Sequence, residues 1–207
     1  MAASSSRRSV MTLFSDPRCP DSHRVRMVLA EKGITVDILD TDPSDPGEDM
    51  LEYNSYGNLP TLVDRDLVLY QPQIIMEYLD ERFPHPPLLP VDPVQRANSR
   101  IHLHRVDEDW FRPVQAILAN GDPDGSARKR LKESLVKTAP VFEAHPYFMS
   151  EELTLVDCSI APLLWRLPMM GVKLPSAAMP IVEYAARVFK HESFKASLTE
   201  LEMEMRD

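Results

Sequence analysis

Cys19 is the residue of this chain whose type and position point most directly to covalent chemistry. It begins the run Cys-Pro-Asp-Ser, between an apolar stretch of strand length and a predicted helix that starts near Asp21. A thiol at a helix N-terminus faces the positive end of the helix dipole, which favours the thiolate, and Arg18, His23 and Arg24 could strengthen that effect. A nucleophilic thiolate is therefore one hypothesis, and an unreactive cysteine in an exposed loop is the other.

A run of prolines could instead serve recognition. It reads Phe83-Pro-His-Pro-Pro-Leu88, and it opens a stretch with five prolines: Pro84, Pro86, Pro87, Pro90 and Pro93. Proline lacks a backbone donor and disfavours helix at the residue before it, so this segment is expected to be extended and stiff. It can be a linker that sets the angle between two domains, or a preorganised surface in which Phe83 and Leu88 offer apolar area and His85 a polar contact. Both interpretations can hold together.

The remaining reactive side chains suggest structure rather than chemistry. Cys158 lies in an apolar stripe and is expected to be an inert core thiol. His102 and His104 are two positions apart, so a helix would point them in different directions, and no metal site is predicted. The sequence contains no glycine-rich phosphate loop and no Gly-x-Ser-x-Gly elbow. Three glutamates near the C-terminus are interpreted as a solvated face: Glu200, Glu202 and Glu204.

The composition of the chain argues against a nucleic-acid-binding protein, a disulfide-rich secreted protein and a membrane protein. The chain has 207 residues, with 32 acidic and 23 basic side chains and a net charge of -9, so direct binding to nucleic acid is not expected. Two cysteines cannot form a disulfide framework, which favours a cytoplasmic location. No stretch approaches the ~18 apolar residues of a membrane span, and the beginning of the chain lacks the apolar run of a signal peptide. We therefore expect a cytoplasmic protein without membrane contact.

Strand and helix signals alternate in the first half of the chain, and only helix signals follow. The predicted order is β-α-β, a loop or short helix, and then β-β-α, with the first two strands parallel. Its segments are strands at 10–14, 34–38, 60–63 and 67–70, a helix that ends at Gly33 and a helix with Pro72 in its first turn. In the second half, apolar residues recur at helical spacing in five stripes: 103–114, 131–142, 156–167, 181–188 and 194–205.

This succession of elements resembles the glutathione transferase family. Three features carry the resemblance: the strand that runs into the Cys19 loop, the Leu59-Pro60 pair before the hairpin, and the box from Thr154 to Asp157 that opens an apolar helix. In that family the proline is cis, and the residue before it pairs its backbone with glutathione. The resemblance implies a fold of class α/β plus all-α. Its parts would be a thioredoxin-like N-terminal domain at 8–85, a proline-rich linker at 86–93 and an all-helical domain at 94–207.

Longer runs resemble the bacterial stringent starvation protein A family. They cover 8–15, 28–33, 60–65, 74–88 and 161–168, and the Phe-Pro-His-Pro-Pro-Leu run is the most specific of them. Members of that family bind RNA polymerase as homodimers and regulate transcription in starvation and acid stress. The resemblance implies a non-catalytic regulator without a cofactor. It would dock on RNA polymerase holoenzyme, including the sigma factor, through Phe83–Leu88.

A glutathione-dependent thiol transferase or reductase is the alternative. The Cys-Pro-x-Ser run at Cys19 resembles the monothiol form of the glutaredoxin and omega-class transferase site, and Leu59 and Gln71 would then contact glutathione. The expected binding site is incomplete, because Gln71-Pro72 stands where that family usually has an acid and a serine. Proline supplies neither an amide nor a hydroxyl, and Asn58 offers no positive charge to the glycine end of glutathione. Weak or absent glutathione binding is therefore expected.

Overall fold

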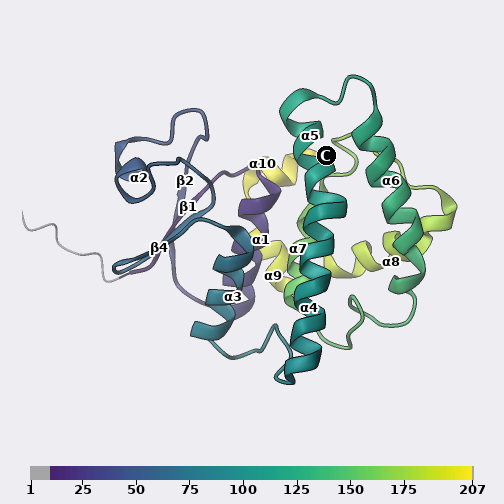
Figure 1. Ribbon diagram of the computed structural model, residues 1–207, viewed down its shortest axis with the longest axis horizontal. Coiled ribbons are helices and arrows are strands. Elements are labelled where there is room, and N and C mark those ends of the chain that lie inside the picture. The colour runs from purple at the N-terminus through teal and green to yellow at the C-terminus, as the bar shows by residue number, and fades with distance from the viewer. Residues whose placement is uncertain (1–9, 207) are drawn as a thin grey trace, which may run out of the picture.

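A four-stranded mixed sheet and three helices form the first part of the molecule (Figure 1). The structure is a computed structural model and describes residues 10–206, so residue 8, the expected start of the first domain, lies outside it. The elements are β1 (Thr12–Ser15), α1 (Pro20–Lys32), β2 (Asp37–Asp40), α2 (Glu48–Tyr53), β3 (Thr61–Asp64), β4 (Leu67–Leu69) and α3 (Pro72–Arg82). The sheet order is β2-β1-β3-β4, with β1 parallel to β2 and antiparallel to β3. The predicted order of strands and helices is confirmed.

Residues of β1 pack on both faces of the sheet, because successive residues of a strand point to opposite sides. Leu13 of β1 is fully buried in a cluster with residues of α1 and α3, such as Val28 and Leu79. Its neighbour Phe14 belongs to a second cluster with Met50 of α2. Figure 1 shows α1 and α3 between the sheet and the helical part, so the sheet contacts the rest of the molecule mainly through these two helices.

The second strand differs from the one expected at 34–38. β2 begins at Asp37, lies at the edge of the sheet, and has four exposed residues. Ile34 and Val36 instead pack against the core in the segment that precedes the strand. These two side chains therefore anchor the connection between α1 and β2. Their alternation with polar residues does not mark a half-buried strand.

Helices form the second part of the molecule, as predicted. They are α4 (Pro93–Val106), the π-helical turn η1 (Asp107–Phe111), α5 (Arg112–Asn120), α6 (Ser126–Thr138), η2 (Ala139–Phe142), α7 (Leu155–Trp165), η3 (Ser176–Ala178), α8 (Met179–Val188), α9 (Glu192–Ser197), α10 (Glu200–Met203) and η4 (Glu204–Arg206). Asp92 begins α4 by accepting hydrogen bonds from Val94 N at 3.1 Å and Gln95 N at 2.9 Å. Within the described part of the chain, no helix has the length and apolar character needed to span a membrane.

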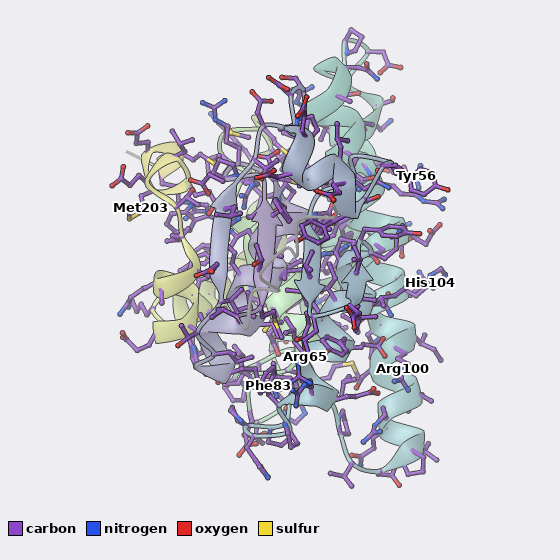
Figure 2. All side chains as sticks on the ribbon, turned by 90° about the vertical axis from the view of Figure 1, so that its left-hand side faces the viewer. Tyr56, Arg65, Phe83, Arg100, His104 and Met203 are labelled. Carbon is purple, nitrogen blue, oxygen red and sulfur yellow. The ribbon has the colours of Figure 1, made fainter. Side chains whose placement is uncertain are left out.

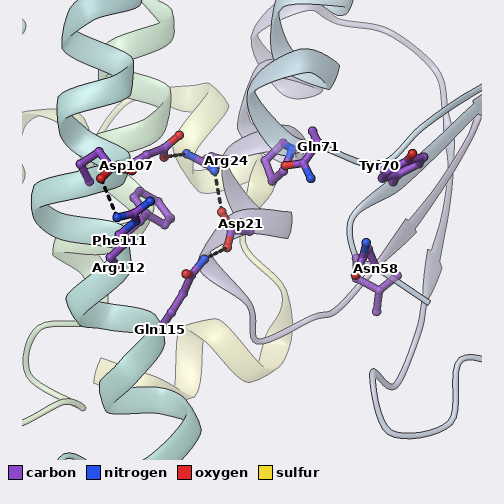
Figure 3. Close-up of a pocket in the computed structure, with 12 residues that line it drawn as sticks. Asp21, Arg24, Asn58, Tyr70, Gln71, Asp107, Phe111, Arg112 and Gln115 are labelled. Atoms are coloured by element: carbon purple, nitrogen blue, oxygen red, sulfur yellow. Dashed lines mark hydrogen bonds and ion pairs between the residues drawn. The ribbon is translucent and has the colours of Figure 1, made fainter. Parts of the chain in front are cut away.

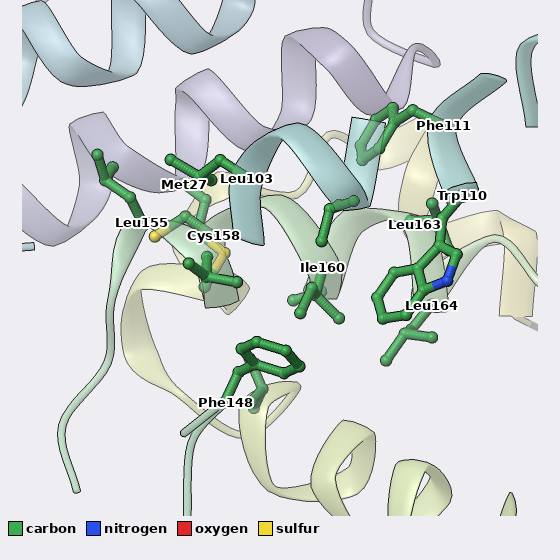
Figure 4. Close-up of a cluster of buried hydrophobic side chains, with 14 of the residues drawn as sticks. Met27, Leu103, Trp110, Phe111, Phe148, Leu155, Cys158, Ile160, Leu163 and Leu164 are labelled. Carbon is green, nitrogen blue, oxygen red and sulfur yellow. The ribbon is translucent and has the colours of Figure 1, made fainter. Parts of the chain in front are cut away.

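Helix α7 lies at the centre of the structure. All residues from Leu155 to Leu164 are buried, as expected of a helix that is apolar around most of its circumference. Figure 4 shows Met27 of α1 and Leu103 of α4 in the same cluster as Cys158 of α7. Because one hydrophobic cluster includes residues of both parts, the sheet and the helical part share a core.

The C-terminal stripe predicted as one helix at 194–205 forms two short helices. α9 ends at Ser197, and Leu198 has an extended backbone with φ of -72° and ψ of 136°. Thr199 then begins α10: its side chain accepts a hydrogen bond from Glu202 N at 3.1 Å, and Glu202 Oε2 accepts one from Thr199 N at 3.0 Å. This Thr-x-x-Glu capping box starts a new helix, and apolar periodicity alone does not reveal it.

Glu202 is buried, which corrects the interpretation of the three C-terminal glutamates as a solvated face. Its Oε1 pairs with Arg26 of α1 at 2.6 Å and with Arg166, the residue after α7. Arg26 also donates to Ser15 Oγ at 2.6 Å, and Arg166 to the carbonyl oxygen of Arg18 at 2.9 Å. We call Arg26, Arg166 and Glu202 the buried charge cluster. It connects the end of the chain to both parts of the molecule.

We expect Glu202→Gln to lower the free energy of unfolding by about 3 kcal/mol, because both arginines would remain buried without their carboxylate. Equilibrium unfolding in urea measures this loss. Glu200→Gln is the matched control, since Glu200 is exposed on the same helix and its substitution should change stability by less than about 0.5 kcal/mol. Equal losses in the two variants would contradict a structural role for the buried charge cluster.

Candidate functional site

The segment from Phe83 to Leu88 connects α3 to α4 and turns four of its residues outward: Pro84, His85, Pro86 and Pro87. The two ends of the segment are less exposed than these four residues. Phe83, labelled in Figure 2, is half-buried and packs against the core, and Leu88 is only 2% exposed. The expectation that Leu88 offers apolar area to a partner is therefore wrong, because that side chain belongs to the core. We call the exposed residues Pro84–Pro87 the proline surface.

Buried charges hold the proline surface from behind. Asp80 of α3 accepts hydrogen bonds from the backbone N–H groups of Leu88 at 2.8 Å and Leu89 at 3.1 Å. Lys32 Nζ, at the end of α1, pairs with Asp80 at 2.6 Å and also donates to the carbonyl oxygen of Pro86. The Lys32 side chain is fully buried, so these two acceptors replace the water that a lysine normally binds. The backbone of the proline surface is thus fixed to α1 and α3.

The sequence motifs do not single out Asp80 or Lys32, but the buried face of α3 contains a signal for Asp80. Ile75, Met76 and Leu79 define the buried stripe of α3, and Asp80 falls within it, four residues after Met76. A carboxylate on the buried face of a helix needs partners, so this position indicates an internal ion pair. Lys32 gives a weaker signal, because a base in the last turn of a helix is common.

A cleft between the first part of the molecule and the helical segments η1 and α5 is the second candidate site (Figure 3). Its volume is about 320 Å³. Leu59 and Gln71, the two expected glutathione contacts, both line it, and the Leu59–Pro60 peptide bond is cis, as the resemblance implies. Cys19 is not among the residues that line the cleft. The structure thus brings together the two expected ligand contacts but does not add the thiol to them.

The arginines of the cleft already have carboxylate partners. Arg24 of α1 pairs with Asp21 at 2.6 Å and with Asp107 at 2.5 Å, and Arg112 pairs with Glu108 at 2.7 Å (Figure 3). Arg24 Nε is buried without an acceptor among the described residues, which leaves a single N–H and not a free cation.

The residues at the N-terminus of α3 add little for glutathione. Gln71 precedes that helix without forming a side-chain cap, and Pro72 has no backbone N–H to offer a ligand. A glutathione carboxylate would therefore have to compete with existing ion pairs, and the residues present do not fit that ligand well.

Cys19 is half-buried at the residue before α1 and has the properties of an unactivated thiol. Burial raises its pKa to about 11, the negative charge of Asp21 adds to the rise, and the helix N–H groups do not offset both effects. His23 is fully buried, and burial together with the nearby Arg166 lowers its pKa, so it stays neutral. Arg24 pairs with two carboxylates. The expectation that these two neighbours strengthen the thiolate is therefore wrong.

The remaining predicted residues have structural roles. Cys158 is fully buried, and burial raises the pKa of its thiol, as expected for a core cysteine. The box at the start of α7 is confirmed: Asp157 accepts hydrogen bonds from Thr154 N at 2.8 Å and Thr154 Oγ1 at 2.7 Å. The same carboxylate also accepts from Phe148 N and from Tyr184 Oη, so it joins three segments of the helical part.

Three histidines each lie near a single glutamate: His23 near Glu202, His145 near Glu151 and His191 near Glu31. His102 packs edge-on against Phe148, and His104 points to solvent. Over residues 10–206, no group of three or more His, Cys, Asp or Glu side chains could hold a metal ion.

Comparison with known proteins agrees with this architecture. Residues 13–87 match the family model of the glutathione S-transferase N-terminal domain. A solved structure, the omega-class glutathione transferase 3C of Trametes versicolor, superposes with a TM-score of 0.81 at 24% identity, covering 92% of this chain and 89% of that one. At this identity the likeness shows the fold alone: a glutathione S-transferase-like fold with a thioredoxin-like sheet domain and a helical domain.

Two curated relatives are much closer in sequence. The stringent starvation protein A homolog of Coxiella burnetii is 51% identical, with 97% of both chains covered. That of Pasteurella multocida is 52% identical, with 96% of this chain and 94% of the relative covered. At such identity over nearly the whole length, the chain belongs to the stringent starvation protein A family, which builds on the glutathione S-transferase fold.

Proposed function

We propose that this protein is a non-catalytic transcription regulator of starvation and stress that binds RNA polymerase holoenzyme, including the sigma factor, through the proline surface. The observation that carries the proposal is the exposure of Pro84–Pro87 on a backbone held by Asp80 and Lys32. The names of the curated relatives support a role in starvation. The internally paired cleft and the raised pKa of Cys19 support a role without catalysis.

The physical basis of docking would be preorganisation. A segment that is already fixed loses little conformational entropy on binding, so more of the contact energy remains as affinity. Proline rings present apolar area that no backbone ladder can cover, and His85 between them can donate or accept a hydrogen bond. The net charge of -9 fits contact with protein subunits rather than with DNA. Simultaneous contact with sigma factor and core enzyme would alter promoter choice or escape.

We also infer that the protein acts as a homodimer through α3 and α4. Large apolar side chains are exposed on these two helices: Ile74 at 55%, Val94 at 67% and Ile101 at 58%. Arg100 of α4, at the exposed edge in Figure 2, pairs with Glu77 of α3 at 2.7 Å, so a charge contact links the two helices. A contiguous apolar patch is typical of a subunit interface, and we propose that these side chains form one across α3 and α4.

We expect His85→Ala combined with Pro86→Ala to abolish capture of purified bacterial RNA polymerase holoenzyme by the immobilised protein. The double substitution removes the central polar contact and one ring of the proline surface, while thermal stability should change little. His145→Ala combined with Pro123→Ala is the matched control, because it removes one histidine and one proline outside that surface. Capture that survives the first substitution would refute the surface, and failure of the wild type to capture holoenzyme would refute the proposed function.

We expect Val94→Glu combined with Ile101→Glu to convert a dimer into a monomer of 23.6 kDa, since like charges would face each other across the interface. Size-exclusion chromatography with light scattering measures the mass. Leu118→Glu combined with Met179→Glu places the same charges at apolar residues exposed elsewhere and should leave the dimer intact. A monomeric wild type would rule out the homodimer, and an unchanged mass in the first variant would rule out this interface.

We expect iodoacetamide to alkylate Cys19 at least about tenfold more slowly than a free cysteine near neutral pH, since the raised pKa keeps the thiol protonated. Because the pKa of Cys19 is raised, its alkylation rate should keep rising at alkaline pH, where the rate of a free thiol has already levelled off. Peptide mass spectrometry measures it, with the urea-unfolded protein as the reference for an exposed thiol. A rate that levels off near neutral pH would instead favour the thiol transferase alternative.

A further inference from the structure

An apolar groove in the helical part of the molecule has no role in the proposed function. It lies between the end of α7, the loop that follows that helix, and α8, and its volume is about 490 Å³. This volume falls within the range of small-molecule sites. Its floor consists of side chains that are at most 5% exposed: Leu164, Leu167, Val172 and Ile181.

The loop that forms one wall of the groove is held in place by its own backbone. Met170 N bonds to Arg166 O at 3.1 Å, and Val172 N bonds to Leu167 O at 3.0 Å. Gly171 has a φ of 70°, a conformation that other residues rarely adopt. The groove is therefore formed before any ligand arrives, which lowers the entropy cost of binding.

Among the described residues, two cations are the charged side chains that line the groove: Lys173 and Arg206. The Arg206 guanidinium lies against the rings of both Trp165 and Phe189, with Cζ 4.5 and 4.6 Å from their centroids. Two of its nitrogens donate to carbonyl oxygens at the end of α7, and Nη1 has no acceptor among the described residues. Within residues 10–206, neither cation forms an ion pair with a carboxylate. Among residues 10–206, one end of an otherwise apolar groove thus carries positive charge that no carboxylate pairs with.

We propose that this groove binds a single-chain aliphatic carboxylate, such as a medium-chain fatty acid. The chain would cover the floor of the groove, and the carboxylate would accept hydrogen bonds from Arg206 and Lys173. The remaining lining contains no serine, threonine, asparagine, glutamine or histidine. A ligand with polar groups along its length would leave them unsatisfied there, whereas one with an apolar body and a single anionic end would not.

Isothermal titration of the full-length protein with decanoate, below its micelle concentration, tests the proposal. We expect saturable binding at one site. The variant Lys173→Gln combined with Arg206→Gln should weaken binding about fivefold, the loss of two partly exposed charge contacts. Lys129→Gln combined with Arg130→Gln is the matched charge control, because both cations are exposed on α6 outside the groove, and it should bind as the wild type does.

A second pair of variants locates the site independently of charge. Ala185 lines the groove, so Ala185→Leu should fill part of it and abolish decanoate binding, while Ala116→Leu on the exposed face of α5 should not. Absence of saturable binding to the wild type would overturn the proposal. Equal affinity for decanol, or an unchanged affinity in the Lys173/Arg206 variant, would overturn recognition of the carboxylate. None of these outcomes depends on whether the protein binds polymerase.

Discussion

Buried charge, in addition to apolar contact, determines how the two parts of this molecule join. The apolar core alone would tolerate small shifts of α1 against α7, because the hydrophobic effect is not directional. The carboxylate of Glu202 does not tolerate them, since Arg26 and Arg166 must both reach it from different helices. A buried ion pair adds little stability over an apolar replacement, but an unmatched one is costly. The buried charge cluster therefore selects one arrangement of sheet and helices among those that the core would allow.

The same principle extends to the surface proposed for recognition. Asp80 and Lys32 place a second buried ion pair between α1 and α3, and both residues also bond to the backbone around Pro86 and Leu88. The position of the proline surface thus depends on the packing of α1, which the buried charge cluster fixes from its other side. An exposed segment with no hydrogen-bonded secondary structure gains the rigidity of the core in this way.

Local signals in the sequence were sufficient for most of the fold. Gly33, Pro72 and the box at Thr154 mark helix ends through backbone chemistry that acts within a few residues, and the structure confirms them. The errors at Leu88 and Glu202 concern burial, which depends on residues distant in the chain. Leu88 belongs to the core, and its backbone bonds to Asp80 of α3 and to Leu155 of α7. Glu202 is buried against Arg26 of α1 and Arg166, the residue after α7. No periodicity within a window of ten residues contains that information.

The ion pairs of the cleft weigh against the glutathione chemistry that the shared fold suggests. The elements that would position glutathione are present, including the cis bond before Pro60, yet the charges facing the cleft form pairs across it, from Arg24 to Asp107. A ligand carboxylate gains little from an arginine whose own carboxylates already satisfy it, because binding would exchange one ion pair for another. The thiol at Cys19 is protonated for a similar reason, since burial and the charge of Asp21 outweigh the helix dipole. If the proposed function holds, the internal pairing of these charges leaves the proline surface, and not the cleft, as the site of recognition on this fold.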